Sequence, residues 1–246
     1  MTKHIDREVL DTADSVAQRA ALLIAEDARL AVAARGRFVL AVSGGRTPWQ
    51  MLQALASADV PWPAIHIVQV DERVAPAGDP DRNLTHLRES LRDAPLPPGQ
   101  IAEMPVAAAD LETAAAEYGA TLQRLAGSPP VLDLVHLGLG PDGHTASLVP
   151  GDPVLTIANA DVGVTAPYQG RRRMTLTYPI INRARRILWV VTGGEKAPML
   201  VRLLDGDESI PAGRVRRDRA LLIADHPAAA LLAPEQPRRS RAGIKK

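Results

Sequence analysis

A histidine that follows a glycine-rich turn is the first residue here whose type and spacing suggest chemistry. His144 follows Gly143 in the stretch LGLGPDGHTASLVPGD (137–152), and Asp142 lies two positions before it. An imidazole can take a proton from water near neutral pH, and a carboxylate can fix which ring nitrogen carries the hydrogen. The pattern predicts a general base at the start of a short helix, with a hydrogen-bonded structural histidine as the alternative.

The same stretch contains the spacing G-x-G-x-x-G, which is typical of dinucleotide sites. Such a site needs a long helix from the third glycine and an acidic residue about 20 positions later, at the end of a second strand. Pro150 and Gly151 interrupt the chain soon after Gly143, and Asp161 precedes its candidate strand. The sequence therefore disfavours nucleotide binding.

A candidate anion site follows the apolar run 37–42. It consists of Ser43, Gly44, Gly45, Arg46 and Thr47. The glycines allow N–H groups to point at one spot, and a helix with Pro48 at its first position would add the positive end of its dipole. Alternatively, Thr47 and Gln50 form only a T-x-x-Q capping box. Lys196, after the run 186–191, is either a solvated lysine or a second cation for the same anion.

Asp71 and Arg73 follow the apolar run 65–70. If the extended backbone continues, the two side chains lie on one side and Glu72 lies on the other. They either face a ligand or form an exposed ion pair of little energetic value.

Other catalytic groups find little support. Ser43 and Ser147 are not in a G-x-S-x-G motif, and His136 and His144 do not have the spacing of a helical zinc pair. There is no cysteine, hence no thiolate nucleophile or ligand. The sequence predicts neither a metal nor a cofactor.

The elements that must position these residues follow a repeated pattern. Short apolar runs, each followed by a turn and a helical pattern, occupy 37–42, 65–70, 132–137, 186–191 and 220–224. This alternation predicts an α/β fold, with a parallel sheet, helices on both faces, and ligands at the carboxyl ends of the strands. We further expect a helix over 9–34, a pair of strands near 161–166 and 173–179, and a surface loop over 94–100.

Composition narrows the range of partners. Aromatic residues are only 3% of the 246 residues, which leaves few platforms for stacking bases and predicts no nucleic-acid partner. No stretch approaches the roughly 18 apolar residues of a membrane span, and the first residues do not resemble a secretion signal. With no cysteine, these features predict a cytoplasmic protein that does not bind membranes.

The chain is expected to form a single domain over 1–236 and a basic, disordered tail over 237–246. The tail carries five Lys or Arg residues, and removing them from the net charge of +1 leaves −4 for the rest. We expect a monomer or a weak homodimer.

Five motifs in order resemble those of the 6-phosphogluconolactonase family: SGGRTP, VDERVAP…DRN, LDLVHLGLGPDGHTASLVPG, RRRMTLTYPIIN and VVTGGEKAPML. DGHTASLxPG is the most specific of them, since the related glucosamine-6-phosphate deaminases typically continue to Asn-Glu-Pro-Gly instead. The resemblance implies a three-layer α/β/α fold with a mainly parallel, Rossmann-like sheet, similar to that of the deaminases. It also implies hydrolysis of 6-phospho-D-glucono-1,5-lactone in the oxidative pentose phosphate pathway.

The resemblance also implies roles for individual residues. His144 would be the base that activates water, supported by Asp142 or Asp71, and Arg73 would orient the lactone or its oxyanion. The implied substrate contacts are the phosphate cradle 43–47 with Lys196 and Arg173, and backbone N–H groups near Gly140 to Gly143 for the oxyanion. A Lys-Pro-Pro segment frequent in the family is replaced by PYQGRRR, so Tyr168, Arg171, Arg172 or Arg173 would take over that lysine's contact.

Two alternatives remain at the level of sequence. One is a glucosamine-6-phosphate deaminase or isomerase, which would release ammonia. The other is a non-catalytic sensor of sugar phosphates, although the presence of Asp142, His144 and Arg73 together argues against lost chemistry.

Overall fold

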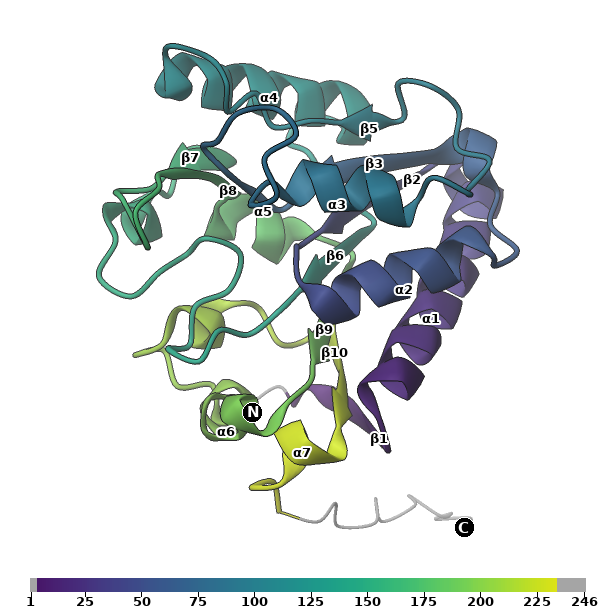
Figure 1. Ribbon diagram of the computed structural model, residues 1–246, viewed down its shortest axis with the longest axis vertical. Helices are drawn as coiled ribbons and strands as arrows, with labels where there is room; N and C mark the ends of the chain where they lie inside the picture. Colours follow the sequence, from purple (N-terminus) through teal and green to yellow (C-terminus); the bar gives the residue numbers. More distant parts are fainter. Residues whose placement is uncertain (1–3, 234–246) are drawn as a thin grey trace, which may run out of the picture.

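A computed structural model describes residues 4–233, so the predicted basic tail over 237–246 lies outside the described residues. Within this range a seven-stranded sheet has the order β1-β10-β9-β6-β2-β3-β5, and its neighbouring strands run parallel (Figure 1). In that order the strands are Asp6–Leu10, Ala220–Asp225, Arg186–Val191, Leu134–Leu137, Phe38–Val42, Ile65–Gln69 and Ile101–Ala102. All five apolar runs predicted as strands are confirmed.

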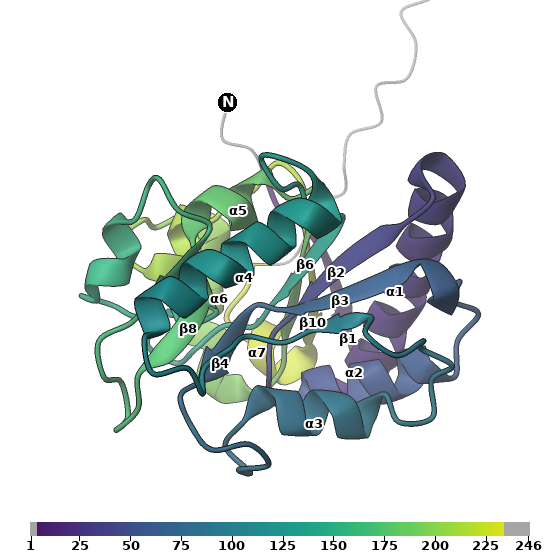
Figure 2. The same cartoon turned by 90° about the horizontal axis from the view of Figure 1, so that it is seen from above.

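Helices cover both faces of this sheet (Figure 2). The described α-helices are α1 (Ala13–Arg35), α2 (Arg46–Ala56), α3 (Asn83–Ser90), α4 (Leu111–Ala126), α5 (Tyr178–Arg183), α6 (Ala197–Asp205) and α7 (His226–Ala229). Side chains alternate along β2: Phe38 and Leu40 pack with the core of α1, α2 and α3, whereas Val39 packs with the core of α4, α5 and α6. The predicted three-layer α/β/α fold is confirmed.

The first helix begins later than the sequence pattern predicts. Val9, the first residue of the predicted helix, lies in β1, an edge strand of the sheet that pairs with β10. Thr12 caps α1 by accepting a hydrogen bond from the Ser15 amide, and Gly36, with φ of 74°, ends the helix. β1 was not expected, because half-buried residues next to a helical pattern give no separate strand signal.

A small antiparallel sheet of order β4-β8-β7 adjoins the large one. Its strands are β4 (Asp71–Arg73), β8 (Arg173–Leu176) and β7 (Val162–Val164). The predicted strand pair is confirmed but shorter, because Tyr178 and Pro179 begin α5. Val70 joins the sheets: its amide donates to the Val42 carbonyl in β2, and its carbonyl accepts from the Leu176 amide in β8.

The predicted loop over 94–100 contains no helix or strand. No helix within residues 4–233 is long and apolar enough to cross a lipid bilayer.

Candidate active site

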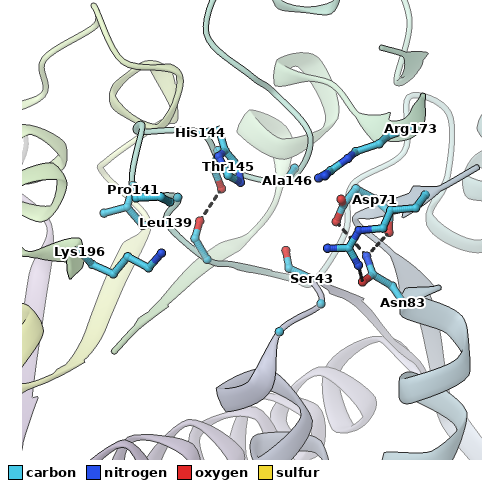
Figure 3. A pocket seen from close by; sticks show the side chains of 15 residues that line it. Ser43, Asp71, Asn83, Leu139, Pro141, His144, Thr145, Ala146, Arg173 and Lys196 are labelled. Carbon is cyan, nitrogen blue, oxygen red and sulfur yellow. Dashed lines mark hydrogen bonds between the residues drawn. The ribbon is translucent and has the colours of Figure 1, made fainter. Parts of the chain in front are cut away.

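A cavity of about 200 Å³ lies at the carboxyl ends of β2, β3 and β6 (Figure 3). It is lined by Ser43, Gly44, Gly45, Asp71, Arg73, Asn83, Gly138, Leu139, Gly140, Pro141, His144, Thr145, Ala146, Arg173 and Lys196. Parallel strands bring their carboxyl ends to one edge, so residues far apart in sequence meet there. Arg73, Arg173 and Lys196 give the cavity three cationic side chains.

His144 lies on one wall of the cavity and is paired with Asp142. Its Nδ1 lies 2.5 Å from Asp142 Oδ1, and the same oxygen accepts the His144 backbone N–H at 3.1 Å. Since an ionised carboxylate can only accept, this contact assigns a hydrogen to Nδ1, and in the neutral form of the ring Nε2 then has the free lone pair. Asp142 therefore makes the contact that the sequence left open between Asp142 and Asp71, although its own side chain does not line the cavity.

The loop that carries His144 is built from turns. The predicted helix start at His144 is wrong: the next helix is η2 (Pro153–Thr156), a short 3-10 helix. The Gly140 amide donates to the His144 carbonyl at 2.8 Å, and the Gly143 amide donates to the Gly140 carbonyl at 3.0 Å. These two N–H groups already donate hydrogen bonds within the loop. They are therefore not available to bind an oxyanion, contrary to what the resemblance implied.

Glycine at position 140 is required by the closeness of the imidazole. A Cβ at Gly140 would lie 2.1 Å from His144 Nδ1. Gly143, with φ of 82°, does not line the cavity, and its carbonyl accepts a hydrogen bond from the Ala212 amide. Gly143 therefore shapes the loop and Gly140 makes room for the ring.

Asp71 is buried on the other side of the cavity, on β4. Its Oδ2 accepts a hydrogen bond of 2.6 Å from Ser147 Oγ. Burial raises the pKa of Asp71, while the Ser147 hydrogen bond and the charges of Arg73 and Arg173 act in the opposite direction. In the described structure its hydrogen-bond partners are Ser147 and Asn83, and His144 is not among them.

Arg73 is held in place by Asn83, the first residue of α3, and by the Asp81 carbonyl, which accepts a hydrogen bond of 2.9 Å from Arg73 Nη1. Arg73 Nη1 donates to Asn83 Oδ1 at 3.0 Å, and Asn83 Nδ2 donates to the Asp71 carbonyl at 2.9 Å. The sequence missed Asn83 as a site residue, although the DRN in the second motif contains it. Its amide side chain joins Asp71 and Arg73, the two residues of β4 that line the cavity.

Glu72 points away from the cavity, as the alternation in β4 predicted. Its carboxylate is fully buried and accepts hydrogen bonds of 2.8 Å from the backbone amides of Asn83 and Leu84. It also lies 3.1 Å from the guanidinium of Arg82. Glu72 thus caps α3 and fixes the position of Asn83.

The candidate anion loop lies beneath the cavity, before α2. Ser43, Gly44 and Gly45 line the cavity, whereas Arg46 is exposed and Thr47 is buried against Thr192, with 2.7 Å between the hydroxyl oxygens. Among the described residues no hydrogen bond occupies the amides of Gly44 and Gly45. Two free amides at the positive end of an 11-residue helix have the geometry and the charge that suit an anion.

The capping-box alternative for this loop is wrong. The N-cap residue of α2 is Gly45, which has no side chain to cap with, and Pro48 stands at the third helical position instead of the first. The loop is held instead by His136 on β6, whose Nδ1 accepts the Ser43 amide at 3.3 Å and whose carbonyl accepts Ser43 Oγ at 3.0 Å.

Only one of the three consecutive arginines faces the cavity. Arg171 pairs with Asp79 and Asp81, and Arg172 pairs with Glu112. Arg173 is buried, lines the cavity, and lies over the ring of Tyr168, with its Cζ 4.9 Å from the ring centroid. Of these three, Arg173 is placed to contact a ligand.

Metal ligands are scarce around the cavity. Across residues 4–233 there is no group of three or more His, Cys, Asp or Glu residues that could hold a metal ion. The arrangement can instead hold an anion at the loop before α2 and activate a water molecule at His144 Nε2.

Comparisons with known proteins identify the family of this chain. The profile of the family described as "Glucosamine-6-phosphate isomerases/6-phosphogluconolactonase" matches residues 11–223. A 6-phosphogluconolactonase of Synechocystis sp. is 39% identical over 77% of this chain and 80% of its own length. A human 6-phosphogluconolactonase is 35% identical over 81% of this chain and 78% of its own length.

Solved structures show the same fold. A 6-phosphogluconolactonase from Trypanosoma cruzi superimposes with a TM-score of 0.85 and 26% identity, over 95% of this chain and 99% of that one. A monomeric glucosamine-6-phosphate deaminase, 20% identical, reaches a TM-score of 0.80 over 92% of this chain and 100% of its own, which extends the likeness of the fold to that enzyme class.

Proposed function

This chain belongs to the family of glucosamine-6-phosphate isomerases and 6-phosphogluconolactonases, and from this premise we propose that it hydrolyses 6-phospho-D-glucono-1,5-lactone to 6-phospho-D-gluconate. In this proposal the protein acts in the cytoplasm, as a monomer or weak homodimer, in the second step of the oxidative pentose phosphate pathway. The pairing of Asp142 and His144 beside a cavity with three cationic side chains is the observation that carries it.

His144 acts as the base in this mechanism. Its Nε2 takes a proton from a water molecule while the water oxygen forms a bond to the lactone carbonyl carbon. Asp142 keeps the hydrogen on Nδ1 and stabilises the imidazolium that forms. When the ring C–O bond breaks, the imidazolium returns its proton to the departing ring oxygen, which leaves a free hydroxyl and a carboxylic acid. The acid then releases its proton, which came from the attacking water, to solvent and becomes the carboxylate.

Positive side chains stabilise the oxyanion of the tetrahedral intermediate. Because the amides of Gly140 and Gly143 are already bonded within their loop, this role falls to Arg73 and Arg173. Asn83 fixes the Arg73 guanidinium, which reduces the reorganisation needed during the reaction.

The phosphate group binds at Ser43, Gly44 and Gly45, at the start of α2. The free backbone amides donate hydrogen bonds to the phosphate, and the positive end of the helix dipole favours its negative charge. Lys196, which follows β9, adds a positively charged side chain. Arg46 and Thr47 shape this loop without contacting the phosphate directly. Holding the phosphate at one end of the cavity places the lactone carbonyl near His144.

Hydrolysis of freshly generated 6-phosphogluconolactone, followed by proton release, tests the proposal. We expect wild-type protein to exceed the uncatalysed rate and His144→Ala to lose at least a hundredfold of that activity, since general-base catalysis contributes roughly 10²–10⁴. His226→Ala, at an exposed histidine on α7, is the matched control.

Release of ammonia from glucosamine 6-phosphate, without lactone hydrolysis, would instead establish the deaminase. Binding of 6-phosphogluconate without turnover of either substrate would establish a sensor.

A further inference from the structure

Tyr168 contacts both the Asp142–His144 pair and Arg173. Its hydroxyl donates to Asp142 Oδ2 at 3.1 Å, and its ring meets the His144 ring edge-on, with 5.8 Å between centroids and 67° between planes. The guanidinium of Arg173 lies over the same tyrosine ring at 4.9 Å. One side chain thus contacts the carboxylate, the imidazole and a cation of the cavity.

The segment that carries Tyr168 is a tight hairpin tip between β7 and β8. Tyr168 and Arg171 exchange backbone hydrogen bonds of 2.9 and 3.3 Å, and the two residues between them have positive φ, 52° at Gln169 and 81° at Gly170. Positive φ at a residue other than glycine is unfavourable, so the turn is held by its surroundings. Gln169 Oε1 accepts a hydrogen bond of 3.2 Å from Arg173 Nη2, which adds a second link to that arginine.

The tyrosine hydroxyl completes the hydrogen bonding of Asp142. One carboxylate oxygen serves His144 and the other serves Tyr168, so the carboxylate cannot rotate without losing a partner. Burial acts to raise the pKa of Asp142, but the hydrogen bonds from His144 and Tyr168 bring that pKa below its ordinary value. Burial and the Asp142 charge raise the pKa of Tyr168, so its hydroxyl keeps its hydrogen and remains a donor at neutral pH.

We propose that Tyr168 is a positioning residue: it holds the Asp142–His144 pair through its hydroxyl and Arg173 through its ring, so that base and cation meet the substrate in one fixed arrangement. This inference rests on the proposed lactonase function and deepens it. The hydroxyl contacts Asp142 and the ring contacts Arg173, so different substitutions can remove the hydroxyl alone or the hydroxyl together with the ring.

The steady-state kinetics of two variants distinguish the role of the Tyr168 hydroxyl from that of its ring. Tyr168→Phe removes only the hydroxyl, and we expect kcat to fall about tenfold with KM unchanged, as loss of a hydrogen bond to a charged group of ~1.5 kcal/mol implies. Tyr168→Leu also removes the ring under Arg173, and KM should then rise as well. Tyr178→Phe, which loses a hydrogen bond to the Pro211 carbonyl outside the cavity, should keep wild-type kinetics. Wild-type kcat in Tyr168→Phe would overturn the inference.

A double-mutant cycle tests whether the hydroxyl acts through Asp142. In an Asp142→Ala background the hydroxyl has no carboxylate to hold, so adding Tyr168→Phe should cause less than a twofold further change in kcat. A merely structural role would instead produce the same tenfold loss in both backgrounds, and that additive result would contradict the inference.

A measurement without substrate distinguishes this inference from the proposed function. In wild-type protein labelled with ¹⁵N at histidine, NMR should show His144 as a single Nδ1-protonated form with a slowly exchanging hydrogen. Tyr168→Phe should exchange that hydrogen at least severalfold faster, whereas Tyr178→Phe should not. An unchanged exchange rate in Tyr168→Phe would overturn the positioning role, whereas a wild-type protein that fails to hydrolyse the lactone would overturn only the proposed function.

Discussion

Arg73 and Arg173 stand directly opposite each other across the antiparallel strands β4 and β8, and both line the cavity. Like charges at such a cross-strand pair are destabilising, and Arg173 is in addition buried, with no hydrogen-bond partner for its Nε among the described residues. Burial lowers the pKa of Arg173, which the charge of Asp71 opposes. The pairing of Arg73 with Arg173 therefore lowers the stability of the fold, and it places two positive charges side by side along the cavity.

Replacing Arg173 should therefore separate stability from function. We expect Arg173→Met to unfold at an equal or higher temperature than wild type, because a buried, incompletely paired charge is removed. The same variant should raise KM for the phosphorylated lactone at least tenfold, while Arg173→Lys should recover part of the affinity. Thermal denaturation and steady-state kinetics measure the two effects, and a large loss of melting temperature in Arg173→Met would contradict the first.

Gly140→Ala should displace the His144 imidazole. Its Cβ would lie 2.1 Å from His144 Nδ1, so either the ring or the loop must move. A shift of about 1 Å in a catalytic group can cost roughly a hundredfold in rate, and we expect a loss of this order in kcat. Gly119→Ala makes the same change in α4, where a Cβ meets nothing within 4 Å, and should gain about 0.5–1 kcal/mol in stability with unchanged kinetics. Normal turnover in Gly140→Ala would show that the ring position is not critical.

Asn83→Ala should loosen the Arg73 guanidinium, which then keeps, within the described structure, only the hydrogen bond from Nη1 to the Asp81 carbonyl. The substitution removes the acceptor for Arg73 Nη1 and the donor to the Asp71 carbonyl, while Glu72 still caps the helix through the backbone amide. We expect a fall in kcat/KM of about tenfold and a loss of about 1–3 kcal/mol in the free energy of unfolding, since the Asp71 carbonyl loses its partner. Asn83→Asp keeps an acceptor for Arg73, so it serves as the partial-rescue control. Equal kinetics for Asn83→Ala and wild type would contradict the role of Asn83.

His136 should make stability depend on pH. Burial lowers its pKa from 6.5 to about 3, so between these values the unfolded chain binds a proton that the folded protein does not. The stability contributed by neutral His136 is complete above pH 6.5 and is lost as the pH falls, by about 1.4 kcal/mol per pH unit until the folded pKa is reached.

Urea unfolding at pH 7, 6 and 5 measures this effect. His136→Asn keeps an acceptor for the Ser43 amide but cannot titrate, so the difference between wild type and variant should shrink as the pH falls. A constant difference between wild type and His136→Asn would contradict the prediction.

The amino-acid sequence by itself determined five of the seven strands of the large sheet, the helices on both of its faces and the edge at which the candidate site lies. Apolar runs followed by turns suffice for this, because parallel strands bring their carboxyl ends to one edge. Local patterns also identified His144, Asp142 and the glycines at 44 and 45 as candidate site residues, because the relevant contacts, such as that between Asp142 and His144, join residues close together in the sequence.

Only the tertiary structure decided which groups meet across the cavity. Asp142, and not Asp71, contacts His144, because Asp71 is engaged by Ser147 from the opposite side. Arg173 faces the cavity while its two neighbours are paired elsewhere, and α3 brings Asn83 to Arg73. These contacts join residues distant in sequence, and a spacing along one chain carries no information about a partner on another strand.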